Sequence, residues 1–442
     1  MPSIPHRAAI VAPGQHRQPG TVLTDHFFEV PLDHAEPARA QITVFAREIV
    51  ATEKAGNAGE LPWLCFLQGG PGRPSPRPNG RRDTWLDRAL RDYRVLLLDQ
   101  RGTGRSTSAN RLTLARLGTS QAQADYLTHF RADSIVADAE LIRYQLAGGA
   151  QWSVLGQSFG GFCTVTYLSQ APQGLAEAFI TGGLPGLATT ADDVYLATYP
   201  LVAAKNAAHY ERYPADVAVV RAIVSHLTSR EVLLPSGATL TAEAFQALGV
   251  WLGATTGSHD LHYLLEAAFD GDELGDDFRY RIDALLTFSG GPLYATLHEA
   301  CYAQEAATHW SAHRIREQFG AFSAAAALDY GDPVLFTGEM IYPWMFRSDP
   351  VLRPLADVAD ILAEHEAWPR LYDPAGLANN EVPVAAAVYY DDMYVPRQFS
   401  VETAAQIRGL RRWVTSEYEH DGLRLSRGAV LDRLIGMVRG YC

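Results

Sequence analysis

The segment Gly156-Gln-Ser-Phe-Gly160 constrains the fold of this chain more than any other. It follows a short apolar run at 152–155 and precedes a helix-like run at 162–169. A serine in such a segment occupies a sharp turn between a strand and a helix, where glycines let two backbones approach closely. The segment therefore predicts a strand, a raised serine hydroxyl at Ser158 and a helix, in that order.

Continuous apolar runs elsewhere in the chain predict further strands. The run at 62–68 ends in a glycine-rich turn, and so does the run at 93–98. Parallel strands that are buried on both faces are apolar throughout rather than alternating, which favours a parallel α/β sheet. Further strands are predicted at 176–181, 382–390 and 412–418, helices at 134–146, 401–410 and 429–438, and an antiparallel pair at 26–32 and 41–50.

The stretch between two of these predicted strands, 176–181 and 382–390, has a different character. It is rich in Ala, Leu, Tyr and His and has helix-like segments with few strand-like runs. A helical block inserted after one strand of a parallel sheet is the layout of an α/β-hydrolase fold with a mostly parallel central sheet and an inserted, mainly helical cap domain. The predicted division is an N-terminal arm at 1–22, a first part of the core at 23–187, the cap at 188–345 and a second part of the core at 346–442.

Charge and cysteine content narrow the partners and the compartment. The chain has 442 residues and a net charge of −13, without a run of basic residues, which disfavours nucleic acid and anionic membranes as partners. No apolar run is long enough to span a bilayer, and the polar start does not resemble a signal peptide. We therefore expect a cytoplasmic protein. Its cysteines are scattered, which favours free thiols; they are Cys65, Cys163, Cys301 and Cys442.

Ser158 needs two partners to act as a nucleophile. A base must take the proton of the hydroxyl, and an acid must orient that base. In this fold the partners follow the serine in chain order, each on a loop after a strand. His420 follows the last predicted strand and is the expected base. Asp391 and Asp392 follow the strand before it; adjacent residues of an extended chain point in opposite directions, so these residues alone leave both open as the acid.

Two backbone N–H groups are expected to form an oxyanion hole. One belongs to Phe159, directly after the serine, and the other to Gly70, in the turn after the strand predicted at 62–68. Asp99, Arg101 and Arg105 lie in the next turn, and we interpret them as ion-paired residues that shape it. No glycine loop carries a Gly-Lys-Ser/Thr sequence and no histidine pair has metal-ligand spacing, so we expect no cofactor and no metal.

Six short strings carry a resemblance to a known family. In order they are Gly69-Gly-Pro-Gly, Asp99-Gln-Arg-Gly-Thr-Gly-Arg-Ser, Gly156-Gln-Ser-Phe-Gly-Gly, Gly182-Gly-Leu-Pro, Asp392-Met-Tyr-Val-Pro and Glu419-His-Asp-Gly-Leu-Arg. With them the chain resembles the prolyl aminopeptidase (proline iminopeptidase) family of α/β hydrolases, from about residue 24 to the C-terminus. The resemblance implies Asp392 as the acid, because the family's acid typically begins a D-M-x-x-P string. Gln68 departs from the family, where histidine is common, and should tune the loop without removing a backbone donor.

The resemblance also implies the reaction and its specificity. The family cleaves N-terminal proline from peptides, and carboxylates of the cap bind the free imino group. Glu299 and Glu339 are the candidates, because both lie among aromatic and apolar neighbours; a solvated place on a helix face is the alternative for each. The nearby aromatic residues either wall a flat pocket for the pyrrolidine ring or pack in the core; they are Tyr302, Tyr342, Trp344 and Phe346.

The expected function is that of a serine exopeptidase that releases N-terminal proline through an acyl-enzyme. Its expected partner is a peptide with a free N-terminal proline. A broader aminopeptidase or an esterase with the same triad is the main alternative, because fold and triad do not determine the substrate. A non-catalytic binding module is disfavoured by the intact set of Ser158, Asp392 and His420.

Overall fold

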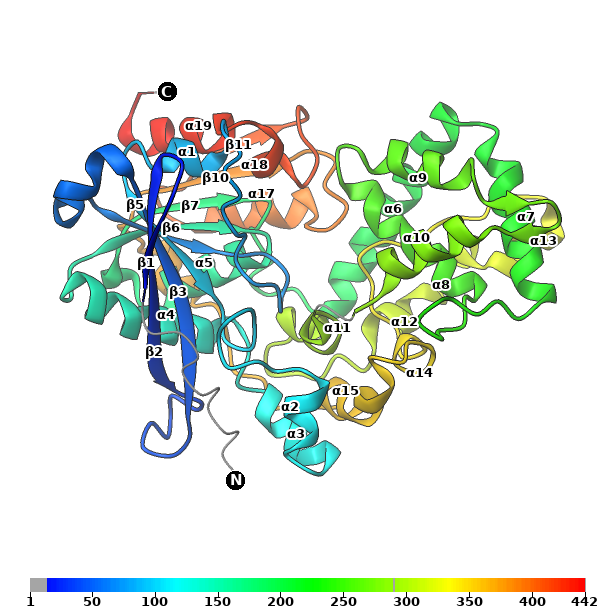
Figure 1. The fold of residues 1–442 in the computed structure, drawn as a ribbon, viewed down its shortest axis with the longest axis horizontal. Coiled ribbons are helices and arrows are strands. Elements are labelled where there is room, and N and C mark those ends of the chain that lie inside the picture. Colours follow the sequence, from blue (N-terminus) through cyan, green and yellow to red (C-terminus); the bar gives the residue numbers. More distant parts are fainter. Residues whose placement is uncertain (1–13, 289–290, 442) are drawn as a thin grey trace.

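A nine-stranded sheet is the centre of the computed structural model, which describes residues 14–288 and 291–441 (Figure 1). The strand order is β1-β2-β3-β5-β4-β6-β7-β10-β11. The three pairs from β1 to β5 are antiparallel and the five pairs from β5 to β11 are parallel, so the sheet is mostly parallel, as predicted. The strands are β1 (Gln15–Gln18), β2 (Thr21–Pro31), β3 (Gln41–Ala51), β4 (Trp63–Leu67), β5 (Arg94–Asp99), β6 (Trp152–Gln157), β7 (Leu175–Thr181), β10 (Val384–Tyr389) and β11 (Arg411–Thr415).

Helices cover both faces of this sheet and form the core lobe together with it. Helices α1 and α19 lie on one face, and α4 and α5 lie on the other (Figure 1). The helices outside the cap are α1 (Trp85–Ala89), α2 (Arg111–Ala115), α3 (Ser120–Leu127), α4 (Ala132–Ala147), α5 (Phe159–Gln170), α15 (Ala356–Ala363), α16 (Pro374–Ala378), α17 (Arg397–Gln406), α18 (Gly422–Leu425) and α19 (Ala429–Arg439).

The central strand β4 shows why its apolar run is continuous. Leu64 and Phe66 belong to the buried cluster on the face of α1 and α19, whereas Cys65 and Leu67 belong to the cluster on the face of α4 and α5. Successive residues of a strand point to opposite faces, so a strand covered on both sides needs apolar residues at every position. The strand predicted at 62–68 is therefore confirmed, together with its parallel neighbours.

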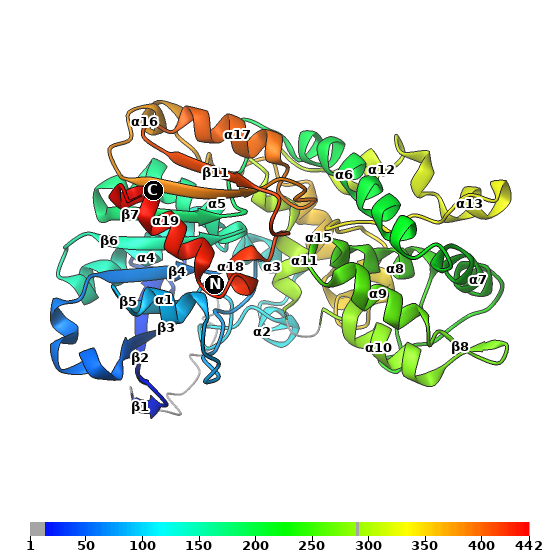
Figure 2. The same ribbon diagram turned by 90° about the horizontal axis from the view of Figure 1, so that it is seen from above.

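A second lobe, the cap lobe, is inserted between β7 and β10 and is mainly helical. Seen from above in Figure 2, it stands beside the core lobe, with α11 near the junction. Residues 188–345, the predicted cap, contain most of it, and the exact boundaries stay a prediction. Its elements are α6 (Ala191–Arg212), α7 (Asp216–Ser229), α8 (Ala242–Gln246), the 3-10 helix η3 (Ala247–Gly253), α9 (Gly257–Leu265), the hairpin β8 (Phe269–Asp270) and β9 (Glu273–Leu274), α10 (Asp276–Leu286), α11 (Pro292–Leu297), α12 (Ser311–Arg316), α13 (Ala324–Tyr330) and α14 (Met345–Ser348).

The entry of the chain into the cap lobe is set by a capping box. The Thr190 side chain accepts a hydrogen bond from the Asp193 N–H, and the Asp193 side chain accepts one from the Thr190 N–H. Two of the N–H groups that a helix start leaves without intrahelical partners are thereby satisfied. Helix α6 begins at Ala191, directly after the N-cap residue Thr190, and carries the chain away from the sheet into the cap lobe.

The N-terminal segment differs from the expected loose arm at 1–22. Residues 1–13 lie outside the described residues, but Gln15–Gln18 form the edge strand β1, which pairs antiparallel with β2 from Thr21. The sequence of β1 is polar throughout, so it lacks the alternating apolar pattern from which a strand can be predicted. The antiparallel pair predicted at 26–32 and 41–50 is confirmed as β2 and β3.

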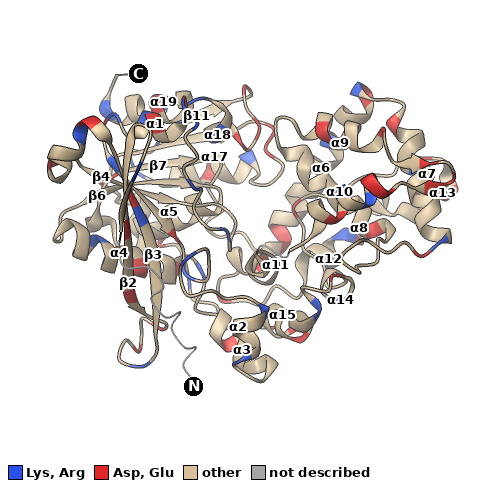
Figure 3. Cartoon of the chain, viewed as in Figure 1, with Lys and Arg blue, Asp and Glu red and all other residues tan. Residues whose placement is uncertain are grey.

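Charge and thiols follow the sequence interpretation where the structure describes them. Lys and Arg are spread over both lobes in the view of Figure 3 and do not gather into a stripe. Cys65, Cys163 and Cys301 are buried and free, as expected, whereas Cys442 lies outside the described residues. Within residues 14–288 and 291–441, none of the helices combines the length and the apolarity that crossing a bilayer requires.

Candidate active site

Ser158 lies at the sharp turn between β6 and α5. Its backbone has φ 84° and ψ −120°, a strained conformation for a residue with a side chain. The turn is tight because a Cβ on Gly156 would come within 2.2 Å of the Gly160 carbonyl oxygen, and one on Gly160 within 1.9 Å of the Leu67 oxygen. Both glycines are therefore required for the contact of β4, β6 and α5 that raises the Ser158 hydroxyl above the sheet.

Three of the predicted residues form one hydrogen-bonded series. Ser158 Oγ lies 2.9 Å from His420 Nε2, and His420 Nδ1 lies 2.7 Å from Asp392 Oδ2. The other Asp392 oxygen accepts hydrogen bonds from the N–H groups of Tyr394 (2.9 Å) and Val395 (3.1 Å), which fixes the carboxylate. Asp392 is 2% exposed, whereas the neighbouring Asp391 is exposed to solvent, so only Asp392 is placed to orient the imidazole.

The surroundings of His420 favour its protonated form. Burial by itself lowers the pKa of His420, but the charge of Asp392 and its hydrogen bond raise the pKa by more. Glu339 adds a smaller contribution in the same direction. The net pKa therefore lies above the ordinary value, as suits an imidazole that must hold a proton taken from Ser158.

The series lies at the carboxyl ends of the parallel strands. Ser158 follows β6, Asp392 follows β10 and His420 follows β11, so three separate loops meet at one edge of the sheet. In open α/β sheets this edge is the usual place of ligand sites, because loops from neighbouring strands converge there. The cap lobe stands over this edge.

Gly70 and Phe159 present the two backbone N–H groups expected for an oxyanion hole. Gly70 lines the same cavity as Ser158, and its φ of 142° is a conformation that favours glycine. Phe159 is the first residue of α5, where backbone N–H groups have no intrahelical partner. In the part of the chain that the structure describes, neither N–H donates to another protein group. Both donors therefore stay available beside the serine.

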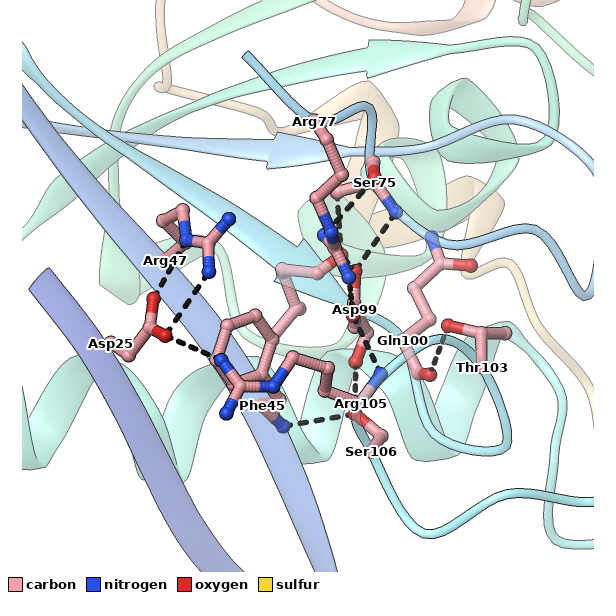
Figure 4. A network of polar contacts seen from close by, with 11 residues as sticks. Asp25, Phe45, Arg47, Ser75, Arg77, Asp99, Gln100, Thr103, Arg105 and Ser106 are labelled. Atoms are coloured by element: carbon pink, nitrogen blue, oxygen red, sulfur yellow. Dashed lines mark hydrogen bonds and ion pairs between the residues drawn. The ribbon is translucent and has the colours of Figure 1, made fainter. Parts of the chain in front are cut away.

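Asp99 anchors the loop that follows Gly70 (Figure 4). It is fully buried and accepts hydrogen bonds from the N–H groups of Ser75 (3.0 Å) and Arg105 (2.9 Å) and from the Arg77 guanidinium (2.8 Å). The expected ion-paired roles of Asp99, Arg101 and Arg105 are confirmed, since they pair with Arg77, Asp138 and Asp25, respectively. The loop that carries Gly70 is thus tied to the end of β5.

A cavity of about 540 Å³ lies between the two lobes and reaches the serine. It is lined from below by Gly69, Gly70, Ser158 and His420 of the core lobe. Most of its remaining wall is apolar and comes from η3, α10, α11 and the segment before α14. An apolar cavity with a few converging polar groups is the usual form of a small-molecule or peptide site.

Glu339 is the predicted cap carboxylate that faces this cavity. It lines the cavity and is only partly buried. Its Oε1 accepts a hydrogen bond of 2.7 Å from the hydroxyl of Tyr294, which also lines the cavity. A carboxylate held in this way can bind a cation that enters the apolar cavity, where an unpaired charge would be costly.

Glu299 does not reach the cavity, although the sequence made it an equal candidate. It is buried, and its two carboxylate oxygens accept hydrogen bonds from the N–H groups of Ser311 (3.0 Å) and Ala312 (2.8 Å). These N–H groups open helix α12, so the structure gives Glu299 the role of a helix cap. Burial raises the pKa of Glu299 to about 7, and the hydrogen bonds from Ala312, Thr308 and Ser311 oppose this shift.

The four aromatic residues near these glutamates divide between the two expected roles. Trp344 lines the cavity between the lobes. Tyr302 lines a smaller apolar pocket. Tyr394 lines both this pocket and the cavity between the lobes. Tyr342 and Phe346 are buried in the core of the cap.

The loop that carries His420 is held by the cap lobe as well as by the sheet. The His420 N–H donates to the Gly253 carbonyl oxygen at 3.3 Å, and Thr255 donates to the Asp421 carboxylate through its N–H (3.1 Å) and its hydroxyl (2.6 Å). Lys205 of α6 adds an ion pair with Glu419. The position of the imidazole therefore depends on the cap.

Three further residues of the cavity were not singled out from the sequence. They are Tyr294, which binds Glu339, and the arginines Arg73 and Arg424. Tyr294 has no distinguishing pattern in the sequence. The arginines had a positional signal, since Arg73 directly follows the Gly69-Gly-Pro-Gly string and Arg424 closes the string that contains His420.

Comparison with known proteins shows which family the chain resembles. Residues 62–267 match the family model described as the alpha/beta hydrolase fold. The chain is 49% identical over 415 residues to a proline iminopeptidase of Aeromonas sobria. The aligned region covers 94% of this chain and 96% of the relative. It is 37% identical over 435 residues to proline iminopeptidase aneH of Aspergillus aculeatus, at 96% and 95% coverage. Among solved structures, it is similar to a proline iminopeptidase of Mycobacterium smegmatis, with 15% identity, a TM-score of 0.43 and coverage of 94% of this chain and 100% of that chain.

The sheet, the serine turn and the matching family model define an α/β hydrolase with an inserted helical cap. Within the α/β hydrolases, the sequence identity to two proline iminopeptidases extends over nearly their whole length. The chain belongs to the proline iminopeptidase family.

Proposed function

We propose that the chain is a serine exopeptidase that releases N-terminal proline from peptides. The observation that carries the proposal is the position of Glu339, whose carboxylate lines the same cavity as Ser158 and His420. A free imino group bound at Glu339 would place the first residue of a peptide in the cavity that contains Ser158, which is the arrangement that an exopeptidase requires. The names of the two relatives support proline as that residue.

The reaction begins with attack of Ser158 Oγ on the carbonyl carbon of proline. His420 Nε2 takes the hydroxyl proton as the new C–O bond forms, and Asp392 stabilises the resulting imidazolium. The negative oxygen of the tetrahedral intermediate accepts hydrogen bonds from the N–H groups of Gly70 and Phe159. When the C–N bond breaks, His420 gives its proton to the leaving amine, and a prolyl ester on Ser158 remains.

Hydrolysis of the ester repeats these steps with water as the nucleophile. His420 takes a proton from water, hydroxide adds to the ester carbonyl, and the second intermediate collapses with return of the proton to Ser158 Oγ. Free proline leaves with its imino group protonated. Binding of that cation by Glu339 is needed only for substrate recognition, whereas the chemistry itself depends on Ser158, His420 and Asp392.

A small substrate panel tests the proposal. Proline arylamide should be hydrolysed, whereas N-acetylproline arylamide should not, because acetylation removes the charge that Glu339 binds. An esterase or a broader hydrolase would instead accept the acetylated compound or simple esters at comparable rates. Ser158→Ala should lower kcat by about 10⁴-fold or more without changing the circular dichroism spectrum. Retained turnover in this variant would contradict the serine mechanism.

A further inference from the structure

Two arginines of the core lobe line the catalytic cavity without a carboxylate partner. Arg73 and Arg424 both belong to its wall, together with Ser158 and His420. Among residues 14–288 and 291–441, neither forms an ion pair with an acidic side chain. Most other arginines near this edge of the sheet are paired, as Arg77 is with Asp99. Two unpaired guanidinium groups at a substrate cavity therefore call for an anionic ligand.

Both arginines belong to segments that adjoin the proposed nucleophile or the oxyanion loop. Arg424 donates a hydrogen bond of 3.1 Å to the side-chain oxygen of Gln157, the residue directly before Ser158. Arg73 follows Gly70 by three residues, in the loop that Ser75 ties to Asp99. Both side chains are exposed to solvent, but Arg424 is tied to the nucleophile turn and Arg73 belongs to the loop that carries Gly70, so both charges lie at the wall of the cavity that contains Ser158.

The two guanidinium groups also repel each other electrostatically. Desolvation by the surrounding protein lowers the pKa of Arg424, Asp421 raises it, and the like charge of Arg73 lowers it again. The Asp421 carboxylate is itself engaged by Thr255, through two hydrogen bonds. An anion bound by both guanidinium groups would relieve their mutual repulsion.

The cavity has an acidic end and a basic end. Tyr294 stands between them, since its hydroxyl binds Glu339 and its ring lies 5.4 Å from the Arg73 guanidinium carbon. Glu339 belongs to the cap lobe, whereas Arg73 and Arg424 belong to the core lobe. This polarity matches a short peptide with a protonated N-terminus and an ionised C-terminus. An extended peptide of two or three residues spans about 7 to 10 Å, which fits inside one such cavity.

We propose that Arg73 and Arg424 bind the C-terminal carboxylate of the leaving group, and that the enzyme is selective for proline-initiated di- and tripeptides. This inference rests on the proposed function and adds the substrate length to it. The net charge of −13 repels anions in general, so a preference for a carboxylate requires a local cationic site of this kind. A longer peptide places its carboxylate outside the cavity and gains nothing from the arginines.

Matched pairs of substrates test the proposal. The kcat/KM of Pro-Ala and Pro-Ala-Ala is compared with that of the same peptides with an amidated C-terminus, and a six-residue pair serves as the length control. The acid should be preferred about tenfold in at least one short pair, as two partly exposed charge-assisted hydrogen bonds would supply. The six-residue pair should show a ratio near one. Raising NaCl to about 1 M should reduce the preference, because exposed charges are screened.

Variants assign the preference to the arginines. Arg73→Gln and Arg424→Gln should each lower the acid-to-amide ratio, and the double variant should bring it near one. The ratio cancels any general effect on Ser158, so a merely structural role of either arginine would leave it unchanged. Arg116→Gln, an exposed arginine outside the cavity wall, is the control and should keep the wild-type ratio.

Three failures are distinguishable. Equal kcat/KM for acid and amide in both short pairs of the wild-type enzyme would overturn the carboxylate site while leaving the exopeptidase intact. A preference that survives in the double variant would overturn the assignment to Arg73 and Arg424. Absence of cleavage of any peptide in the panel would instead contradict the proposed function itself.

Discussion

Lys205 Nζ lies 2.5 Å from Glu419 Oε1, and this ion pair joins helix α6 of the cap lobe to the residue directly before His420. Both side chains are largely withdrawn from solvent, with 14% and 29% exposure. Burial raises the pKa of Glu419, and Lys205 lowers it again. The pair therefore holds the histidine loop against the cap by a contact outside the reacting atoms.

Loss of this pair should slow catalysis by displacing the imidazole. Lys205→Gln should lower kcat by about two- to fivefold, in line with an ion pair of up to about 1 kcal/mol. Glu419→Gln should have a similar effect, and the double variant should cost less than the sum of the two single variants. Kinetics on proline arylamide measure this cycle. Strictly additive effects would show that the pair does not act on the His420 loop.

The raised pKa of His420 sets the acid limb of the pH profile. His420 must be uncharged to take the Ser158 proton, so activity is lost as pH falls through its pKa. Because Asp392 raises this pKa above the ordinary 6.5, kcat/KM should reach half of its maximum above pH 6.5. Asp392→Asn removes the charge and should lower kcat by about 10⁴-fold. A midpoint at or below 6.5 in the wild-type enzyme would show that Asp392 does not raise the pKa of His420.

Glu339 should control recognition of the substrate's imino group. Glu339→Gln leaves a cation without its counter-charge in an apolar cavity, which costs about 2 to 3 kcal/mol and lowers kcat/KM by about 30- to 150-fold. Tyr294→Phe removes only the 2.7 Å hydrogen bond to this carboxylate and should cost a few-fold. Steady-state kinetics of both variants on proline arylamide test the order. A larger loss in Tyr294→Phe than in Glu339→Gln would contradict the assignment.

Glu299 should affect stability rather than recognition. Its pKa of about 7 in the folded state lies above the ordinary 4.5, so the folded protein binds this proton more tightly than the unfolded chain. The resulting stabilisation is present below pH 4.5 and is lost as pH rises to about 7. Relative to Glu299→Gln, which does not titrate, the wild-type free energy of unfolding should therefore fall between pH 5 and pH 7 and then level off.

Denaturant titrations at several pH values measure this difference, and kinetics provide the control. If Glu299 only caps α12, kcat/KM of Glu299→Gln on proline arylamide should stay within about threefold of wild type, apart from small effects of helix stability. A loss of kcat/KM as large as that in Glu339→Gln would indicate that Glu299 also binds the substrate.

The sheet and the series of Ser158, His420 and Asp392 were predictable because their patterns are local. An apolar run such as that of β4 is required wherever a strand is covered on both faces, and Ser158 stands in a motif that, after a strand-like run and before a helix-like run, indicates a strand-to-helix turn. The acid was harder to predict from the sequence, because Asp391 and Asp392 are the same residue type and are adjacent. Only the strand end decides between them, and the family string pointed to the buried one.

The cap was less predictable because its contacts are distant in sequence. Glu299 and Glu339 both stand among apolar neighbours, yet one meets helix α12 and the other meets the cavity, a difference made by tertiary packing alone. Tyr294 becomes relevant only through its contact with Glu339, 45 positions away. The edge strand β1 was not predicted for another reason. A strand at a sheet edge can pair through its backbone without apolar side chains, so its polar sequence showed no strand pattern.

The hydrogen bond from His420 to Gly253, together with the Thr255 contacts, has a consequence for how such enzymes diversify. A cap that merely covered the sheet could be replaced as a module, and specificity could be changed by grafting another one. Here a graft would also remove the contacts that anchor the His420 loop. Chimeras within this family should therefore retain the segment around 250–255 and the residue at 205, so that new specificity arises by changes inside the inherited cap.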